Sequence, residues 1–140
     1  MRAAVLRGGQ MIVRDDVPDP QPGFGQVLVD VKACGICGSD LHFVKHGETM
    51  LELGGQMEGI PDIGQARTDL SRDVFMGHEF CGQVLEAGPD TVAPKAGALV
   101  TSIPIMISMT GVEPIVYCND LPGGYSERML LSAALIQEVP

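Results

Sequence analysis

Glycine and proline recur at short intervals along this chain, with 18 glycines and 10 prolines in 140 residues. Between them lie short apolar runs, such as Ala3 to Leu6, Gln26 to Ala33 and Tyr125 to Ser132. Runs of this length suit strands of about four to eight residues and are too short for most helices. The pattern predicts a mainly β domain, either a barrel or a sandwich.

The strands can be placed from the same pattern. Ala3 to Leu6 and Met11 to Val13 flank a Gly8-Gly9 turn, which predicts a hairpin. In Gln26 to Ala33, valines alternate with other residues, as in a strand with one face on the core. Further strands are predicted at Gly82 to Gly88, Ala98 to Ser102, Ile103 to Ser108, Ile115 to Cys118 and Tyr125 to Ser132.

Helix is predicted in few places. Ser39 or Asp40 is suited to cap a short helix through Leu41 to Val44. Phe43 to Met76 mixes glycines with charges, and we interpret it as a long insertion or surface loop. Within it, Ala66 to Val74 is expected to form one or two helical turns.

Composition excludes several kinds of protein. The length suits one domain, and the formal charge of −9 argues against a nucleic-acid partner, which requires clustered cations. No stretch reaches the roughly 20 apolar residues of a membrane span, and the N-terminus lacks the apolar core of a signal peptide. Four cysteines are too few for a disulfide scaffold of this size, which indicates reduced thiols and a cytoplasmic protein.

Two segments concentrate reactive side chains. Cys34 to His42 reads Cys-Gly-Ile-Cys-Gly-Ser-Asp-Leu-His, and His78 is followed by Glu79. Zinc prefers thiolate, imidazole and carboxylate ligands, and a catalytic zinc site leaves one position for water or substrate. Cys37, His78 and Glu79 supply one ligand of each kind, so they are the candidate metal ligands.

The side chains beside Cys37 suit proton transfer. A bound zinc ion acts as a Lewis acid on an alcohol oxygen, whose proton then needs a route to solvent. Ser39 and His42 lie within one turn of chain and are suited to passing it. Asp40 could orient a metal-bound histidine.

Each residue also has an ordinary interpretation. Cys34 and Cys37 could be half of a structural zinc site, a redox pair or two packed thiols. His78 could be a core histidine, and Ser39 and Asp40 could only cap a helix. The functional hypothesis therefore depends on the combination.

That combination resembles a known family. Met1 to Leu6, Cys34 to His42, Gly77 to Val84 and Gly123 to Glu127 resemble, in order, motifs of the zinc-dependent alcohol dehydrogenases of the medium-chain dehydrogenase/reductase superfamily. The resemblance implies an N-terminal catalytic domain, a GroES-like, partly open β-barrel with a few short helices. It spans nearly the whole chain apart from Phe43 to Met76.

The resemblance also implies a role for each candidate residue. Cys37 and His78 match ligands of the catalytic zinc, and Cys34 does not. Glu79 matches the third ligand of polyol-dehydrogenase-like members, whereas other members use a later cysteine. Ser39 matches the hydroxyl that contacts the substrate oxygen, and His42 matches the end of the proton relay. The remaining residue, Asp40, matches a supporting carboxylate.

Departures from the family set further expectations. Cys118 stands alone where many members carry a four-cysteine structural zinc lobe, so no second zinc is expected. The chain ends at Pro140 and contains no Gly-x-Gly-x-x-Gly, so a Rossmann domain for NAD or NADP is missing from it. We expect a truncated catalytic domain that is inactive alone and whose exposed apolar surface favours a homo-oligomer.

Three functions remain open. The leading hypothesis is an alcohol or polyol dehydrogenase that passes hydride to NAD(P). A non-catalytic GroES-like zinc-binding or assembly module is the alternative. A thiol redox protein that uses Cys34 and Cys37 is disfavoured, because no βαβ pattern surrounds the pair.

Overall fold

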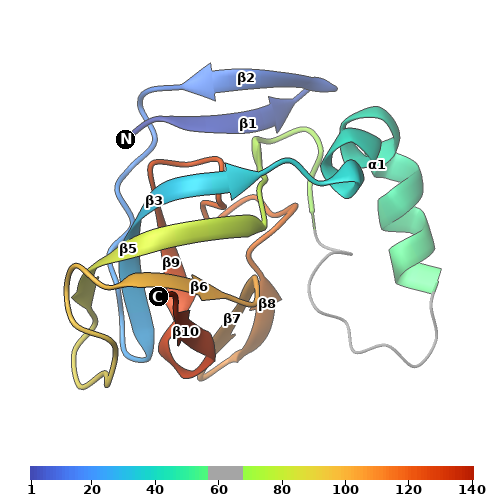
Figure 1. Cartoon of the computed structure of the whole chain (residues 1–140). Helices are drawn as coiled ribbons and strands as arrows, with labels where there is room; N and C mark the ends of the chain where they lie inside the picture. Colours follow the sequence, from blue (N-terminus) through green and yellow to red (C-terminus); the bar gives the residue numbers. More distant parts are fainter. Residues whose placement is uncertain (57–67) are drawn as a thin grey trace.

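The computed structural model describes residues 1–56 and 68–140, except for the side chains of residues 54–56. Its strands form three separate sheets, with strand orders β2-β1-β4, β10-β6-β5-β3-β9 and β7-β8 (Figure 1). All strand pairs among the described residues are antiparallel. The predicted mainly β fold and its partly open barrel are confirmed.

The elements are β1 (Ala3–Arg7), β2 (Gln10–Arg14), β3 (Gln26–Gly35), α1 (Gly38–Gln56), β4 (Val74–Phe75), β5 (Glu79–Ala87), β6 (Leu99–Ser102), β7 (Ile105–Ser108), β8 (Gly111–Pro114), β9 (Arg128–Ser132), a 3₁₀ helix (Ala133–Leu135) and β10 (Ile136–Glu138).

The main core lies on the five-stranded sheet, where β3 pairs with β5 on one side and β9 on the other. Val27, Val29 and Leu131 are completely buried there. The alternation predicted for β3 is incomplete, because Leu28 is buried as well, next to a register shift between Leu28 and Val29. The predicted hairpin of β1 and β2 is confirmed by their antiparallel pairing.

Helix α1 is longer than the sequence predicted. It runs from Gly38 to Gln56, past the predicted end at Val44, with non-helical backbone at His46. The loop interpretation is therefore wrong for residues 43–56. The glycine at 47 does not stop the helix because it is buried against the Phe43 ring, which a Cβ there would contact at 3.5 Å.

Two other local predictions are wrong. Residues 68–73 form a turn that leads into β4, so the described part of Ala66 to Val74 is not helical; Ala66 and Arg67 lie outside the described residues. Ile115 to Cys118 is not a strand: β8 ends at Pro114, and Cys118 makes only an isolated bridge with Phe75. Tyr117 has a φ of +52°, a left-handed conformation that ends a regular strand.

A second cluster holds the start of α1 against the sheets. Phe43 is buried with Leu6, Met76 and Tyr117, and its ring stacks on that of Tyr117 at 4.2 Å between centroids. The helix follows the end of β3 directly (Figure 1). The cluster therefore fixes residues 38–43 relative to the segment around Tyr117. Among the described residues, no helix has the length and apolar character to span a membrane.

Replacing a core residue of β9 should destabilise the fold. Leu131→Ala leaves a cavity in the main core and is expected to lower the free energy of unfolding by about 3 kcal/mol. Leu85→Ala, on the exposed side of β5, is the matched control and should cost less than about 1 kcal/mol. Urea unfolding followed by circular dichroism measures both, and equal losses would contradict the placement of the core.

Candidate active site

The pairing of β3 with β5 brings the two reactive segments together. Gly35 at the end of β3 lies opposite Glu79 at the start of β5, and Cys34 lies opposite Phe80. A Cβ on Gly35 would stand 2.6 Å from Glu79 Oε2, so glycine leaves the space that this carboxylate occupies. Cys37, just beyond β3, is thereby placed beside His78.

Cys37, His78 and Glu79 form a cluster whose candidate ligand atoms all lie within 4.8 Å of one another. Cys37 and His78 are half-buried, and Glu79 is exposed to solvent. His78 Nδ1 is buried without a hydrogen bond, although it lies 3.4 Å from Asp40 Oδ1. A thiol, an imidazole and a carboxylate at this spacing fit a zinc ion.

Gly77 fixes the approach of His78 to the cluster. Its φ is +90°, and a Cβ there would stand 2.6 Å from the backbone nitrogen of Tyr125. That nitrogen donates to the carbonyl of Met76, and Gly124 N donates to the carbonyl of Gly77. The glycine therefore allows the segment between β4 and β5, which carries His78, to pack against the turn at residues 123–125.

Asp40 is a buried carboxylate, with an exposed fraction of 3%. Its Oδ2 accepts from the backbone N–H of Cys37 at 3.1 Å and from the hydroxyl of Tyr125 at 2.8 Å. Its Oδ1 accepts from the hydroxyl of Tyr117 at 3.1 Å. Both tyrosines of the chain therefore donate to this one carboxylate, which offsets the cost of burying it.

Ser39 lies between the hydrogen-bond network of Asp40 and the candidate metal ligands Cys37, His78 and Glu79, called the metal cluster below. Its Oγ is 2.9 Å from the Tyr117 hydroxyl and 3.5 Å from His78 Nε2. Burial raises the pKa values of Tyr117 and Tyr125 above that of a free phenol, so both remain protonated donors at neutral pH. Ser39 Oγ therefore lies between the Tyr117 hydroxyl and the imidazole of His78.

His42 is exposed and lies on the surface of α1. Its ring is 4.9 Å from that of His46, between centroids. Among the hydrogen bonds of the described residues, none joins His42 to Ser39. A relay between Ser39 and His42 stays a prediction from the sequence.

Cys34 lies outside the metal cluster. Its sulfur packs against Gly124, where a Cβ would stand 2.6 Å away. Burial raises the pKa of the Cys34 thiol, whereas a reactive thiol needs a lowered pKa. Both observations favour a packing role and weaken the redox-pair interpretation.

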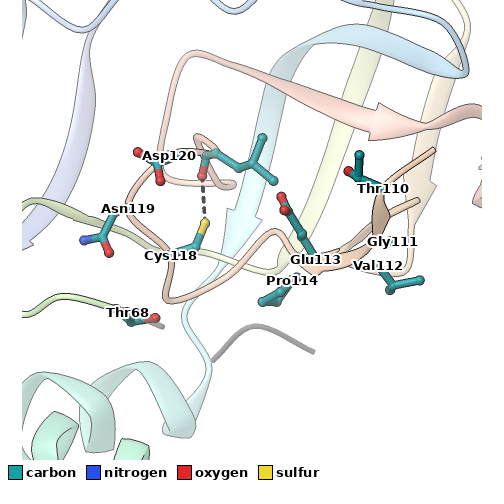
Figure 2. A pocket seen from close by; sticks show the side chains of 10 residues that line it. Thr68, Thr110, Gly111, Val112, Glu113, Pro114, Cys118, Asn119 and Asp120 are labelled. Carbon is teal, nitrogen blue, oxygen red and sulfur yellow. Dashed lines mark hydrogen bonds between the residues drawn. The ribbon is translucent and has the colours of Figure 1, made fainter. Parts of the chain in front are cut away.

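Cys118 is one of the residues that line a separate pocket of about 410 Å³ (Figure 2). Glu113, Asn119 and Asp120 are among its lining residues. The Cys118 thiol donates to the carbonyl of Leu121 at 3.2 Å, and burial raises its pKa. Cys118 thus behaves as a packed thiol with a satisfied hydrogen bond.

Sequence reasoning did not identify Tyr117 and Tyr125 as parts of the site. Tyr125 falls in a matched motif, Gly123 to Glu127, but carried no role there, and Tyr117 was placed in a strand. Their shared partner, Asp40, is distant in the sequence from both. The only local signal was the presence of two tyrosines in a chain without tryptophan, which does not specify a contact.

Comparison with known proteins identifies the family. The family model for the alcohol dehydrogenase GroES-like domain matches residues 23–140, so the chain belongs to this family. It is 36% identical over 126 residues to (R,R)-butanediol dehydrogenase of Bacillus subtilis, covering 90% of this chain and 31% of that protein. It is 31% identical over 143 residues to YphC of Escherichia coli, an uncharacterized zinc-type alcohol dehydrogenase-like protein, covering 93% and 37%.

Solved structures agree with this assignment. The structure of 2R,3R-butanediol dehydrogenase from Bacillus subtilis has a TM-score of 0.70 at 26% identity, covering 99% of this chain and 40% of that one. A dehydrogenase structure from Sinorhizobium meliloti 1021 bound to NADP has a TM-score of 0.69 at 29% identity, covering 99% and 38%. The chain thus spans about a third of the length of the relatives it matches. The predicted resemblance to zinc-dependent alcohol dehydrogenases is confirmed.

The metal cluster predicts a specific pattern of zinc loss. We expect about one zinc ion per chain, lost in Cys37→Ser and His78→Ala, because each variant removes one of the three candidate protein ligands. Cys34→Ser is the matched control and should keep its zinc. Atomic absorption on the purified chains measures the content. Equal loss in all three variants would instead indicate a Cys-x-x-Cys site.

Asp40 should influence zinc binding without being a ligand. Asp40→Asn replaces an acceptor oxygen beside His78 and is expected to weaken zinc binding about 10- to 100-fold. Competition with a chromophoric chelator measures the dissociation constant. Asp16→Asn, on an exposed carboxylate paired with Arg14, is the control and should leave it unchanged. An unchanged constant in Asp40→Asn would contradict the supporting role.

Proposed function

We propose that this chain is the catalytic domain of a zinc-dependent dehydrogenase that oxidises an alcohol or polyol to a carbonyl compound, with hydride passing to NAD(P). The observation that carries the proposal is the cluster of Cys37, His78 and Glu79 with the Ser39 hydroxyl beside it. The class of substrate is supported by the relatives named as butanediol dehydrogenases. We therefore infer that a secondary alcohol or vicinal diol is the substrate.

The candidate site residues have two proposed roles, metal binding and proton transfer. Cys37, His78 and Glu79 would hold zinc, which when bound polarises an alcohol oxygen as a Lewis acid. Ser39 would take the proton that the substrate hydroxyl loses and release its own hydroxyl proton toward His42, because its Oγ lies 3.5 Å from His78 Nε2, at the edge of the cluster. His42, exposed on α1, delivers that proton to solvent.

Asp40 keeps this arrangement in place. It accepts from the N–H of Cys37 and lies 3.4 Å from His78 Nδ1, so it touches the segments of two candidate ligands. Holding reacting groups in fixed positions supplies much of the rate in such sites. The role of Asp40 is therefore to position Cys37 and His78.

Hydride transfer also needs a nicotinamide held beside the substrate. Residues 1–140 contain no Gly-x-Gly-x-x-Gly, so we propose that a separate nucleotide-binding domain supplies it and that this chain alone is inactive. An apolar hollow of about 430 Å³ opens next to Asp40 and Tyr125. The exposed side chains of Ile36 and Leu41 line it, which is consistent with a surface that another domain covers.

The enzyme that carries this domain should reduce NAD⁺ or NADP⁺ in the presence of butane-2,3-diol or sorbitol. A chelator should abolish the reaction, and zinc should restore it, because the substrate oxygen is no longer polarised without metal. Ser39→Ala should lower kcat by roughly 10²- to 10⁴-fold, and His42→Ala should lower it less, because solvent can replace an exposed group. Absorbance at the reduced-nicotinamide band measures the rate.

The same assay separates the two main hypotheses. A zinc-loaded protein that reduces neither nucleotide with any alcohol of the panel would support the non-catalytic assembly module. Cys34→Ser is the control variant and should retain activity, because Cys34 lies outside the metal cluster.

A further inference from the structure

Two histidines lie next to each other on the exposed surface of α1, outside the metal cluster. His42 and His46 are four residues apart, both side chains are exposed, and their ring centroids are 4.9 Å apart. They are two of the three histidines of the chain, and the third, His78, belongs to the metal cluster. We propose that this pair binds a divalent transition-metal ion of the kind that prefers imidazole ligands, such as Ni²⁺, Cu²⁺ or a second Zn²⁺.

The distance between the two rings fits joint coordination of one ion. Metal–nitrogen bonds of about 2.0 to 2.1 Å place two imidazole centroids about 4.5 to 5.2 Å apart when the angle at the ion is about 90° to 110°. The observed 4.9 Å falls within that range. The rings are tilted by 51° and are not stacked face to face. Side-chain rotation is then sufficient to bring one nitrogen of each ring to a shared ion.

The helix holds both side chains on one side of α1. Residues at positions i and i+4 lie one turn apart on the same face, which is the spacing that helical zinc-binding motifs use. The backbone at His46 is non-helical, with a φ of −136° and a ψ of 29°, yet the two rings remain in contact. The buried side of the same turn is fixed, because Phe43 is 1% exposed and stacks on Tyr117. The imidazoles are thus presented from an anchored segment, which lowers the entropy lost on binding.

Ligand type decides which ions the pair can bind. Imidazole nitrogen suits Zn²⁺, Cu²⁺ and Ni²⁺, whereas Mg²⁺ and Ca²⁺ require oxygen ligands. The formal charge of −9 attracts cations to the chain. Among the described residues, no third histidine, cysteine or carboxylate completes the pair, so water fills the remaining positions. The ion therefore exchanges readily and is lost on purification, unlike the zinc expected in the metal cluster.

An ion on this pair would block the proposed exit of the proton. A neutral imidazole has one free nitrogen lone pair, so an ion bound to His42 leaves that ring none with which to accept a proton. Excess metal ion should therefore slow alcohol oxidation. This consequence rests on the proposed function, whereas binding of the ion does not.

Calorimetric titration of Ni²⁺ into the zinc-loaded protein that carries this domain tests the site. The wild type should show a binding event that His42→Gln and His46→Gln each weaken about 10- to 100-fold, because the second imidazole of a pair binds at a high effective concentration. Glu52→Gln, on an exposed residue of the same helix, is the matched control and should leave the affinity unchanged. Equal affinity in the wild type and both histidine variants would overturn the site. An event that only Cys37→Ser removes would also overturn it, because the ion would then lie in the metal cluster.

A second measurement needs no variant. Diethyl pyrocarbonate labels accessible imidazole nitrogens, and peptide mass spectrometry locates the label. Ni²⁺ should protect His42 and His46 together from labelling in the wild-type protein. Unchanged labelling of either residue at saturating Ni²⁺ would contradict shared coordination.

Activity separates this site from the proposed function. Ni²⁺ at a concentration that saturates the wild type should lower its kcat by about the factor that His42→Ala produces, and the ratio of rates with and without Ni²⁺ should stay near one in His46→Gln. Equal inhibition of both proteins would overturn the block at His42. Ni²⁺ binding without any alcohol oxidation would support the site and overturn the proposed function, and oxidation without Ni²⁺ binding would overturn the site alone.

Discussion

The register between β3 and β5 is the constraint on which the site depends. It places Gly35 opposite Glu79, so the ends of two strands that are far apart in the sequence meet at the metal cluster. A shift by one residue would turn the side chains of β5 to the other face and remove Val84 from the core. Burial of the valines and leucines of the main core thus also fixes the positions of the candidate zinc ligands.

Asp40 extends that constraint from the sheet to the rest of the molecule. Its oxygens take hydrogen bonds from the segment after β3, from Tyr117 and from Tyr125. Burying a carboxylate without hydrogen-bond donors costs free energy, so the three donors together stabilise the buried side chain of Asp40. The result is a rigid support behind His78 and Ser39, which is the condition for a site that positions groups within fractions of an ångström.

The predictable parts of the fold were those governed by local pattern. The β1–β2 hairpin and strands β3 and β5 followed from period-two alternation and turn residues. The second half of α1 could not be predicted in this way. Gly47 is typical of a helix end in the sequence, and its close packing on Phe43 is visible only in the structure. The segment at 115–118 was predicted as a strand because its residues are apolar, but the left-handed Tyr117 ends that regularity.

The same division holds for the site. The sequence by itself determined the candidates: Cys37, His78, Glu79, Ser39 and Asp40 form a candidate metal and proton-transfer set by residue type and order. Only the tertiary structure decided which neighbours act on them. It buried Asp40, brought two tyrosines to it and left His42 exposed. Residue type sets which atoms can bind or donate, whereas long-range packing sets which of those atoms come within hydrogen-bonding distance.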